Sequence, residues 1–210
     1  MSHCHRPLII AVCLLSAGIC FAEAPPAVPE WSSEHGLSVK PPAGTGITLG
    51  ELRITLEQTE LKQVQQTLGG KIDHKGDAAD SLYWLCYTLP GMNQRLWLAS
   101  DEMGAGSINH IYAVAGTQPA SQSCPAPKIA VKQAPALDNG LWLGASQKQV
   151  NSLLGKPTLR KGRWLTFLQW RKKTATYQGK QVEADLLNNV DLAMNNGRVA
   201  ILHAHQVESY

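Results

Sequence analysis

Two histidines near the C-terminus, His203 and His205, are separated by a single residue. Side chains alternate between the two faces of a β-strand, so this spacing places both imidazoles on one face. Paired imidazoles are usable zinc ligands, because zinc binds histidine nitrogen together with cysteine or carboxylate. His110, on the corresponding strand of the first half of the chain, is the candidate third ligand, but nothing in the sequence brings it close. We therefore predict a structural or surface role for these histidines, with no metal ligand and no cofactor.

Two carboxylates, Asp77 and Asp80, lie in a glycine-containing segment that follows His74. Such a loop could hold the acid–base pair of a hydrolase. The sequence contains no nucleophile elbow, glycine-rich phosphate loop or His-Glu-x-x-His motif to accompany it. Asp and Gly before a strand are also ordinary turn residues. We predict that the protein is not an enzyme and assign no catalytic residue. The alternative is a small periplasmic enzyme or a metal-binding protein.

Four tryptophans occupy alternating positions in segments rich in strand-forming residues, and they oppose leucine or phenylalanine on those segments. They are Trp84, Trp97, Trp164 and Trp170. If helices cover the Leu/Phe face of a sheet, these indoles line the open face, where aromatic rings are typical anchors for a partner protein. The alternative is that the face assignment is inverted and the rings belong to the core. We predict that the four tryptophans form a binding face.

The N-terminus has the pattern of a secretory signal. An apolar run from Leu8 to Phe21 follows Arg6 and ends at the small-x-small sequence Ala22-Glu23-Ala24. The run is too short to remain as a membrane-spanning anchor. Cleavage is predicted after Ala24 or after Ala22. Lipidation at Cys20 is the rival interpretation, but Ile19 stands where a lipoprotein signal needs a small residue.

Removal of this signal leaves two cysteines, Cys86 and Cys124. An even pair in an exported protein usually forms a disulfide. We predict the bond Cys86–Cys124, which would stabilise the fold by about 3–4 kcal/mol in the chain-entropy model. The net charge stays at +3, which is too weak to indicate nucleic-acid binding.

A short motif divides the rest of the chain. Lys62-Gln63-Val64 recurs as Lys148-Gln149-Val150, and Leu68-Gly69 recurs in register as Leu154-Gly155. The predicted organisation is a signal peptide, a flexible Pro/Gly-rich leader, a first repeat unit, a Pro-rich linker and a second repeat unit. Their respective bounds are 1–24, 25–46, 47–116, 117–137 and 138–210.

Each unit is predicted to contain a short strand, a helix and three antiparallel strands. In the first helix, Leu61, Val64 and Leu68 form one apolar stripe. The second helix begins with Ser146 and Gln149 at capping-box spacing. The predicted strands cover 47–49, 52–56, 81–89, 95–100, 108–115, 141–143, 164–171, 182–194 and 198–206. Asn195-Asn196-Gly197 predicts a tight hairpin turn. The resulting fold class is α+β, a tandem repeat of strand-helix-three-strand units with the helices on one face of an antiparallel sheet.

The motif around the second helix resembles the small α/β modules of the BamE/SmpA-type outer-membrane lipoproteins. Two such modules in tandem resemble the architecture of the β-lactamase inhibitory proteins (BLIP-like). The matching positions are Leu143, Gly144, Ser146, Val150, Leu153, Leu154, Gly155 and Pro157, with Val64, Leu68 and Gly69 in the first unit. The motif is mostly helix-capping and core chemistry, so it concerns fold more than function. No lipidated cysteine is evident, which departs from the BamE type.

The resemblance implies an exported, non-catalytic binding module. Together with the signal and the absence of catalytic motifs, it predicts a periplasmic or secreted protein that binds another envelope or extracellular protein through the open sheet face. The role would be inhibitory or in envelope assembly. We predict no nucleic-acid partner and no membrane span in the mature chain.

Overall fold

The structure is a computed structural model that describes residues 23–29, 44–116 and 119–210. Most of the predicted signal peptide and residues 30–43 of the predicted leader lie outside the described residues. The first half contains β1 (Gly46–Leu49), β2 (Leu52–Thr55), α1 (Leu61–Leu68), β3 (Asp73–Lys75), a 3-10 turn η1 (Ala78–Asp80), β4 (Leu82–Leu89), β5 (Gln94–Asp101) and β6 (His110–Ala115). The second half contains α2 (Gln147–Leu154), β7 (Leu159–Lys161), β8 (Trp164–Tyr177), β9 (Lys180–Asn195) and β10 (Arg198–Ser209).

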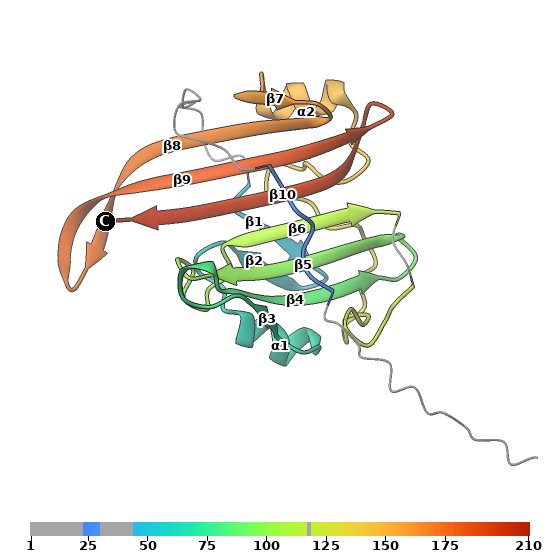
Figure 1. The fold of residues 1–210 in the computed structure, drawn as a ribbon, viewed down its shortest axis with the longest axis horizontal. Helices are drawn as coiled ribbons and strands as arrows, with labels where there is room; N and C mark the ends of the chain where they lie inside the picture. The colour runs from blue at the N-terminus through green and yellow to red at the C-terminus, as the bar shows by residue number, and fades with distance from the viewer. Residues whose placement is uncertain (1–22, 30–43, 117–118) are drawn as a thin grey trace, which may run out of the picture.

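Eight of the described strands form one antiparallel sheet in the order β3-β4-β5-β6-β10-β9-β8-β7 (Figure 1). The two halves of the chain meet where β6 pairs with β10, with Ile111 opposite Ala204. We call this pairing the central seam. Strands β1 and β2 form a separate hairpin. The sheet is therefore continuous across the predicted boundary between the two halves.

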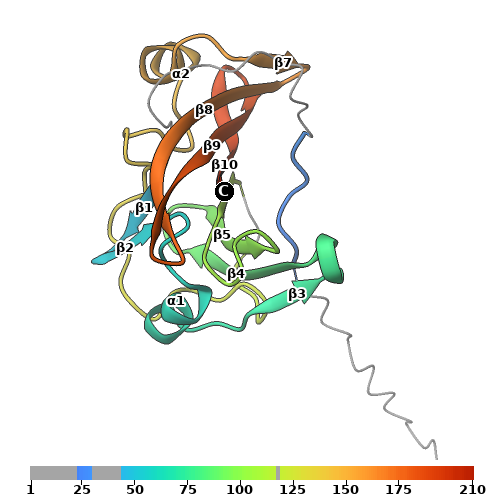
Figure 2. The same ribbon diagram turned by 90° about the vertical axis from the view of Figure 1, so that its left-hand side faces the viewer.

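One face of the sheet carries the main hydrophobic core, because alternate side chains on each strand are aliphatic or aromatic. Leu98 on β5, Phe167 on β8 and Leu202 on β10 belong to this cluster together with Val64 of α1 and Val150 of α2. Figure 2 shows α1, α2 and the β1–β2 hairpin on this same side of the sheet. Within the described residues, the opposite face is therefore free of helices.

A smaller apolar cluster lies on the opposite face of β4, β5 and β6. It contains Trp84, Trp97, Tyr112 and the bonded pair Cys86–Cys124, so the predicted disulfide is confirmed. The bond ties the segment between the two halves to β4, and the Thr88 hydroxyl strengthens the link by donating to the Cys124 carbonyl at 2.8 Å. A disulfide is consistent with an oxidising compartment. Among the described residues, no helix is sufficiently long and apolar to cross a lipid bilayer.

Local capping and turn chemistry defines the ends of several elements. The Ser146 hydroxyl accepts from the Gln149 amide, and the Gln149 side chain accepts from the Ser146 amide, which confirms the predicted capping box. The helix ends at Gly155, whose φ of 77° suits glycine better than any other residue. Asn196 and Gly197 both have positive φ angles between β9 and β10, as a tight hairpin turn requires.

The predicted α+β class, with tandem strand-helix units, is wrong. Strand accounts for 47% and helix for 11% of the described residues, so the protein is mostly β. Each helix has only eight residues. Strand β8 extends to Tyr177 and pairs with β9 over its whole length, although 172–177 is a polar segment. Ladder hydrogen bonds join backbone groups, so a long hairpin can continue without an apolar pattern. The predicted strand at 141–143 is instead irregular chain whose Leu141 and Trp142 enter the core.

Candidate functional site

Three histidines meet at the central seam. His110 begins β6 and is paired in register with His205 on β10, while His203 is opposite Tyr112. All of these side chains lie on the helix-free face, because they alternate with the core residues Ile111 and Ala204. Strand pairing thus supplies the proximity between His110 and the His203/His205 pair that the sequence alone did not.

The buried carboxylate of Asp191 on β9 fixes the direction of the hydrogen bonds around these rings. Its oxygens contact the Thr166 hydroxyl at 2.6 Å, the Asn189 amide nitrogen at 2.7 Å and His203 Nδ1 at 3.0 Å. A carboxylate only accepts, so His203 Nδ1 carries a proton. Burial lowers the pKa of His203, although the hydrogen bond to Asp191 opposes this shift. Burial thus favours the neutral ring, in which Nε2 presents a lone pair.

The lone pair of His203 in turn sets the state of His110. His203 Nε2 lies 3.0 Å from His110 Nδ1, which must therefore be the donor. The other nitrogen of His110, Nε2, lies 3.0 Å from Oδ2 of Asp101, the last residue of β5. This nitrogen can either donate a hydrogen bond to the Asp101 carboxylate or present a lone pair to an ion bound beside it.

His205 also presents a lone pair, because a different residue accepts the proton of its other nitrogen. Its Nδ1 lies 3.0 Å from the Asn189 oxygen, whose identity follows from the donation of the Asn189 nitrogen to Asp191. His205 Nδ1 therefore donates, and Nε2 presents a lone pair. That nitrogen is buried and has no hydrogen-bond partner within the described residues. Burial lowers the pKa of His205 well below its ordinary value, and the neighbouring histidines lower it further.

Asp101 is held as a carboxylate at the end of β5. Burial alone would raise its pKa, but hydrogen bonds from His110, from the Asn109 side chain and from the Gly104 amide outweigh burial and hold the pKa well below its usual range. The Asn109 and Gly104 bonds use Oδ1, which leaves Oδ2 directed at His110. The His110 and Asp101 side chains remain 12% and 27% exposed, so this end of the cluster is accessible to ions.

Potential ligand atoms of Asp101, His110 and His205 all lie within 4.8 Å of one another. We call these three residues the ligand triad. Tetrahedral zinc with bonds of about 2.0–2.1 Å separates its ligand atoms by roughly 3.3 Å. The 3.0 Å between His110 and Asp101 is close to that value. The rings of His110 and His205 are stacked, with centroids 4.2 Å apart and planes at 7°. A single ion in the plane of both rings therefore requires one ring to tilt.

The four tryptophans predicted to form a binding face do lie opposite the helix-covered core, but their exposure differs. Trp84 and Trp97 are only 2% and 4% exposed and pack in the cluster around the disulfide. Trp164 and Trp170 on β8 are half-buried. Two of the four rings are therefore already covered. Protein binding through this face stays a prediction.

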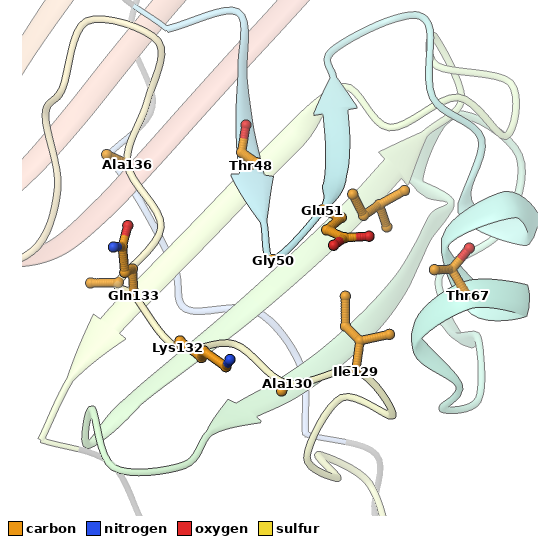
Figure 3. A pocket seen from close by; sticks show the side chains of 11 residues that line it. Thr48, Gly50, Glu51, Thr67, Ile129, Ala130, Lys132, Gln133 and Ala136 are labelled. Carbon is orange, nitrogen blue, oxygen red and sulfur yellow. The ribbon is translucent and has the colours of Figure 1, made fainter.

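The loop carboxylates do not form a constellation with His74. The side chains of His74, Asp77 and Asp80 are exposed, and the His74 ring stacks on Tyr83 with centroids 4.4 Å apart. A groove of about 840 Å³ lies between the β1–β2 hairpin and residues 129–136 (Figure 3). Glu51 and Lys132 are the charged residues among those that line it, and the lining includes no imidazole or thiol. We assign no chemistry to either place.

Comparison with known proteins finds no match, whether with family models, curated proteins or solved structures. The resemblance to BamE-type modules and to the β-lactamase inhibitory proteins therefore stays a prediction. The function must be argued from the site itself. The His203/His205 spacing was visible in the sequence, whereas the roles of Asp101, Asn189 and Asp191 depend on strand register.

Proposed function

We propose that this chain is an exported protein that binds one divalent transition-metal ion, with Zn²⁺ as the preferred ion, through the ligand triad Asp101, His110 and His205. The observation that carries the proposal is the convergence of one carboxylate oxygen and two imidazole nitrogens, of which the buried His205 Nε2 has no hydrogen-bond partner within the described residues. A proton on His110 would satisfy its contact with Asp101 but would leave His205 Nε2 without a partner. One metal ion would satisfy all three atoms once one of the stacked rings tilts.

The donor set favours a transition metal over calcium or magnesium. Imidazole suits zinc, copper, iron and nickel, whereas calcium and magnesium prefer oxygen ligands. Three protein ligands leave a fourth tetrahedral position for water or another small ligand. The triad therefore fits an accessible site rather than a closed structural one, in agreement with the partial exposure of Asp101.

The residues behind the triad support the same proposal. Histidines that bind metals usually donate their second ring N–H to a carboxylate, carbonyl or similar acceptor, which fixes the tautomer. His205 has such an acceptor in Asn189. His110 has one in His203, which is itself anchored by Asp191. Each ring thus keeps its other nitrogen for the ligand triad.

Export is supported by the signal-like N-terminus and by the disulfide. In a periplasmic or secreted location, the site would bind exchangeable zinc from the surrounding solution. The metal would also join β5 and β6 of the first half to β10 of the second half. Binding should therefore raise the stability of the folded state, by about 2.7 kcal/mol when free zinc is 100 times the dissociation constant.

The test is a titration of chelator-treated, disulfide-intact protein with Zn²⁺, followed by calorimetry and by metal analysis after gel filtration. We expect one equivalent of zinc. His205→Phe keeps a ring in place and removes the Nε2 ligand, and Asp101→Asn keeps an oxygen and removes the charge. Each should weaken binding by at least about 100-fold. His74→Phe, an exposed histidine outside the cluster, is the matched control and should bind as the wild type does.

Two results would refute the proposal. If the protein takes up no zinc, copper, nickel or iron, His110 is the imidazolium partner of Asp101 and the cluster is an ion-pair network. If zinc binds but His205→Phe and Asp101→Asn have no effect, the ion is held elsewhere. Circular dichroism of each variant separates loss of ligand from loss of fold.

A further inference from the structure

The segment 23–29 lies across the helix-free face of the sheet, in front of β5, β6 and β10 (Figures 1 and 2). We call it the N-terminal strap. Val28 packs against the apolar cluster that contains Trp97 and the disulfide. The strap passes from the first half of the sheet toward the second. Its attachment therefore determines how this face of the sheet is covered.

The first residue of the strap makes its strongest contacts. The Glu23 carboxylate forms an ion pair with Arg95, whose side chain is only 3% exposed. The Glu23 carbonyl also accepts from the Trp97 indole N–H at 3.0 Å. Arg95 donates in addition to the Pro119 carbonyl at 3.2 Å. A buried guanidinium is costly unless an anion neutralises it, so Glu23 belongs to the folded protein.

The sequence offers two small-x-small sites for a signal peptidase. One is Cys20-Phe21-Ala22, with cleavage before Glu23, and the other is Ala22-Glu23-Ala24, with cleavage before Pro25. Cleavage before Pro25 would remove both the carboxylate and the carbonyl of Glu23 from the sheet. It would also require hydrolysis of the tertiary amide before Pro25, whereas the bond after Ala22 is an ordinary peptide bond.

We infer that the export peptidase cleaves between Ala22 and Glu23, and that Glu23 is the first residue of the mature protein. Hydrolysis adds one water across this peptide bond, leaving a carboxylate on Ala22 and an ammonium group on Glu23. The new N-terminal residue is then fixed by the Glu23–Arg95 ion pair and the Trp97 hydrogen bond. The processing site and the anchoring site are therefore adjacent, and the residue that processing exposes is the one that attaches the strap to the sheet.

The test uses the full chain made in an exporting host, with the N-terminus read by intact mass and N-terminal sequencing. We expect a chain that begins with Glu23. The variant Ala24→Lys destroys the second site and leaves the first intact, and we expect it to be processed to the same N-terminus. A mature chain that begins with Pro25, a lipidated Cys20 terminus or an uncleaved product would each overturn the inference.

The anchoring role has its own measurement. In the exported protein, Glu23→Gln removes the charge that faces Arg95, and we expect the melting temperature to fall by roughly 5 °C or more. Glu51→Gln replaces an exposed glutamate and is the matched control, with no change expected. If Glu23→Gln melts with the wild type, the ion pair does not hold the strap and the structural reason for this cleavage site is overturned.

Discussion

His203 binds no metal in our proposal, yet its replacement should weaken zinc binding. His203→Phe keeps an aromatic ring against Tyr112, whose centroid lies 4.4 Å from that of His203. The change removes the Nε2 acceptor, so the 3.0 Å bond that orients His110 is lost. Loss of a partner that orients a metal ligand typically costs 10–100-fold in affinity. We therefore expect zinc to bind about 10–100 times more weakly, equivalent to about 1.4–2.7 kcal/mol.

The assay is competition for zinc with a chromophoric chelator, performed on the folded variant. Thr166→Val is the matched control, because it removes a different donor to Asp191 and leaves the link from His203 to His110 in place. We expect this control to have the smaller effect on affinity. If His203→Phe binds zinc as tightly as the wild type, the tautomer of His110 is not set by His203, and the reasoning from hydrogen-bond direction is refuted.

Three further predictions concern stability. Reduction of Cys86–Cys124 should lower the free energy of unfolding by about 3–4 kcal/mol; equal urea midpoints with and without reductant would contradict this. Burial raises the pKa of Glu57 from 4.5 to about 7, so the folded state binds a proton more tightly than the unfolded state. That contribution is complete below about pH 4.5 and is lost as pH rises through about 7. Glu57→Gln should therefore reduce the loss of unfolding free energy between pH 4.5 and pH 7 by about 1–2 kcal/mol, after allowance for partial exposure of the group. Urea unfolding at several pH values measures this, and an unchanged pH dependence would count against the prediction. Ser146→Ala should cost about 1 kcal/mol by removing the helix cap formed with Gln149, and an unchanged urea midpoint would show that the cap adds nothing.

Features that depend on neighbouring residues were predictable from the sequence. The capping box at Ser146 and Gln149 needs only two residue types at the right spacing. The turn at Asn196 and Gly197 needs residues that tolerate positive φ. The disulfide followed from counting cysteines in an exported chain. In each case the physical cause lies within one short segment or one countable pair.

The fold class was not predictable in the same way. Residues 172–177 are basic or hydroxyl-bearing except for Ala175 and resemble a solvated turn, yet they complete β8. Their pairing with β9, from Lys172 opposite Asp185 to Tyr177 opposite Lys180, uses backbone groups that the side-chain pattern does not record. The candidate site could not be predicted from the sequence for a related reason. His110 and His203 are 93 positions apart, and only the pairing of β6 with β10 brings them together.

The distribution of unsatisfied buried atoms gives the strongest reason to expect a cation at the central seam. Other buried polar atoms without a partner within the described residues, such as Glu57 Oε1, Trp84 Nε1, Gln169 Oε1 and Asp185 Oδ1, are not atoms of the ligand triad. His205 Nε2 is different, because potential ligand atoms of His110 and Asp101 lie within 4.8 Å of the potential ligand atom of His205. A buried polar network is costly when it is partly satisfied. Here the unsatisfied atom lies within reach of two further ligand atoms, so a single ion, bound after one of the stacked rings tilts, would satisfy His205 Nε2 together with His110 and Asp101.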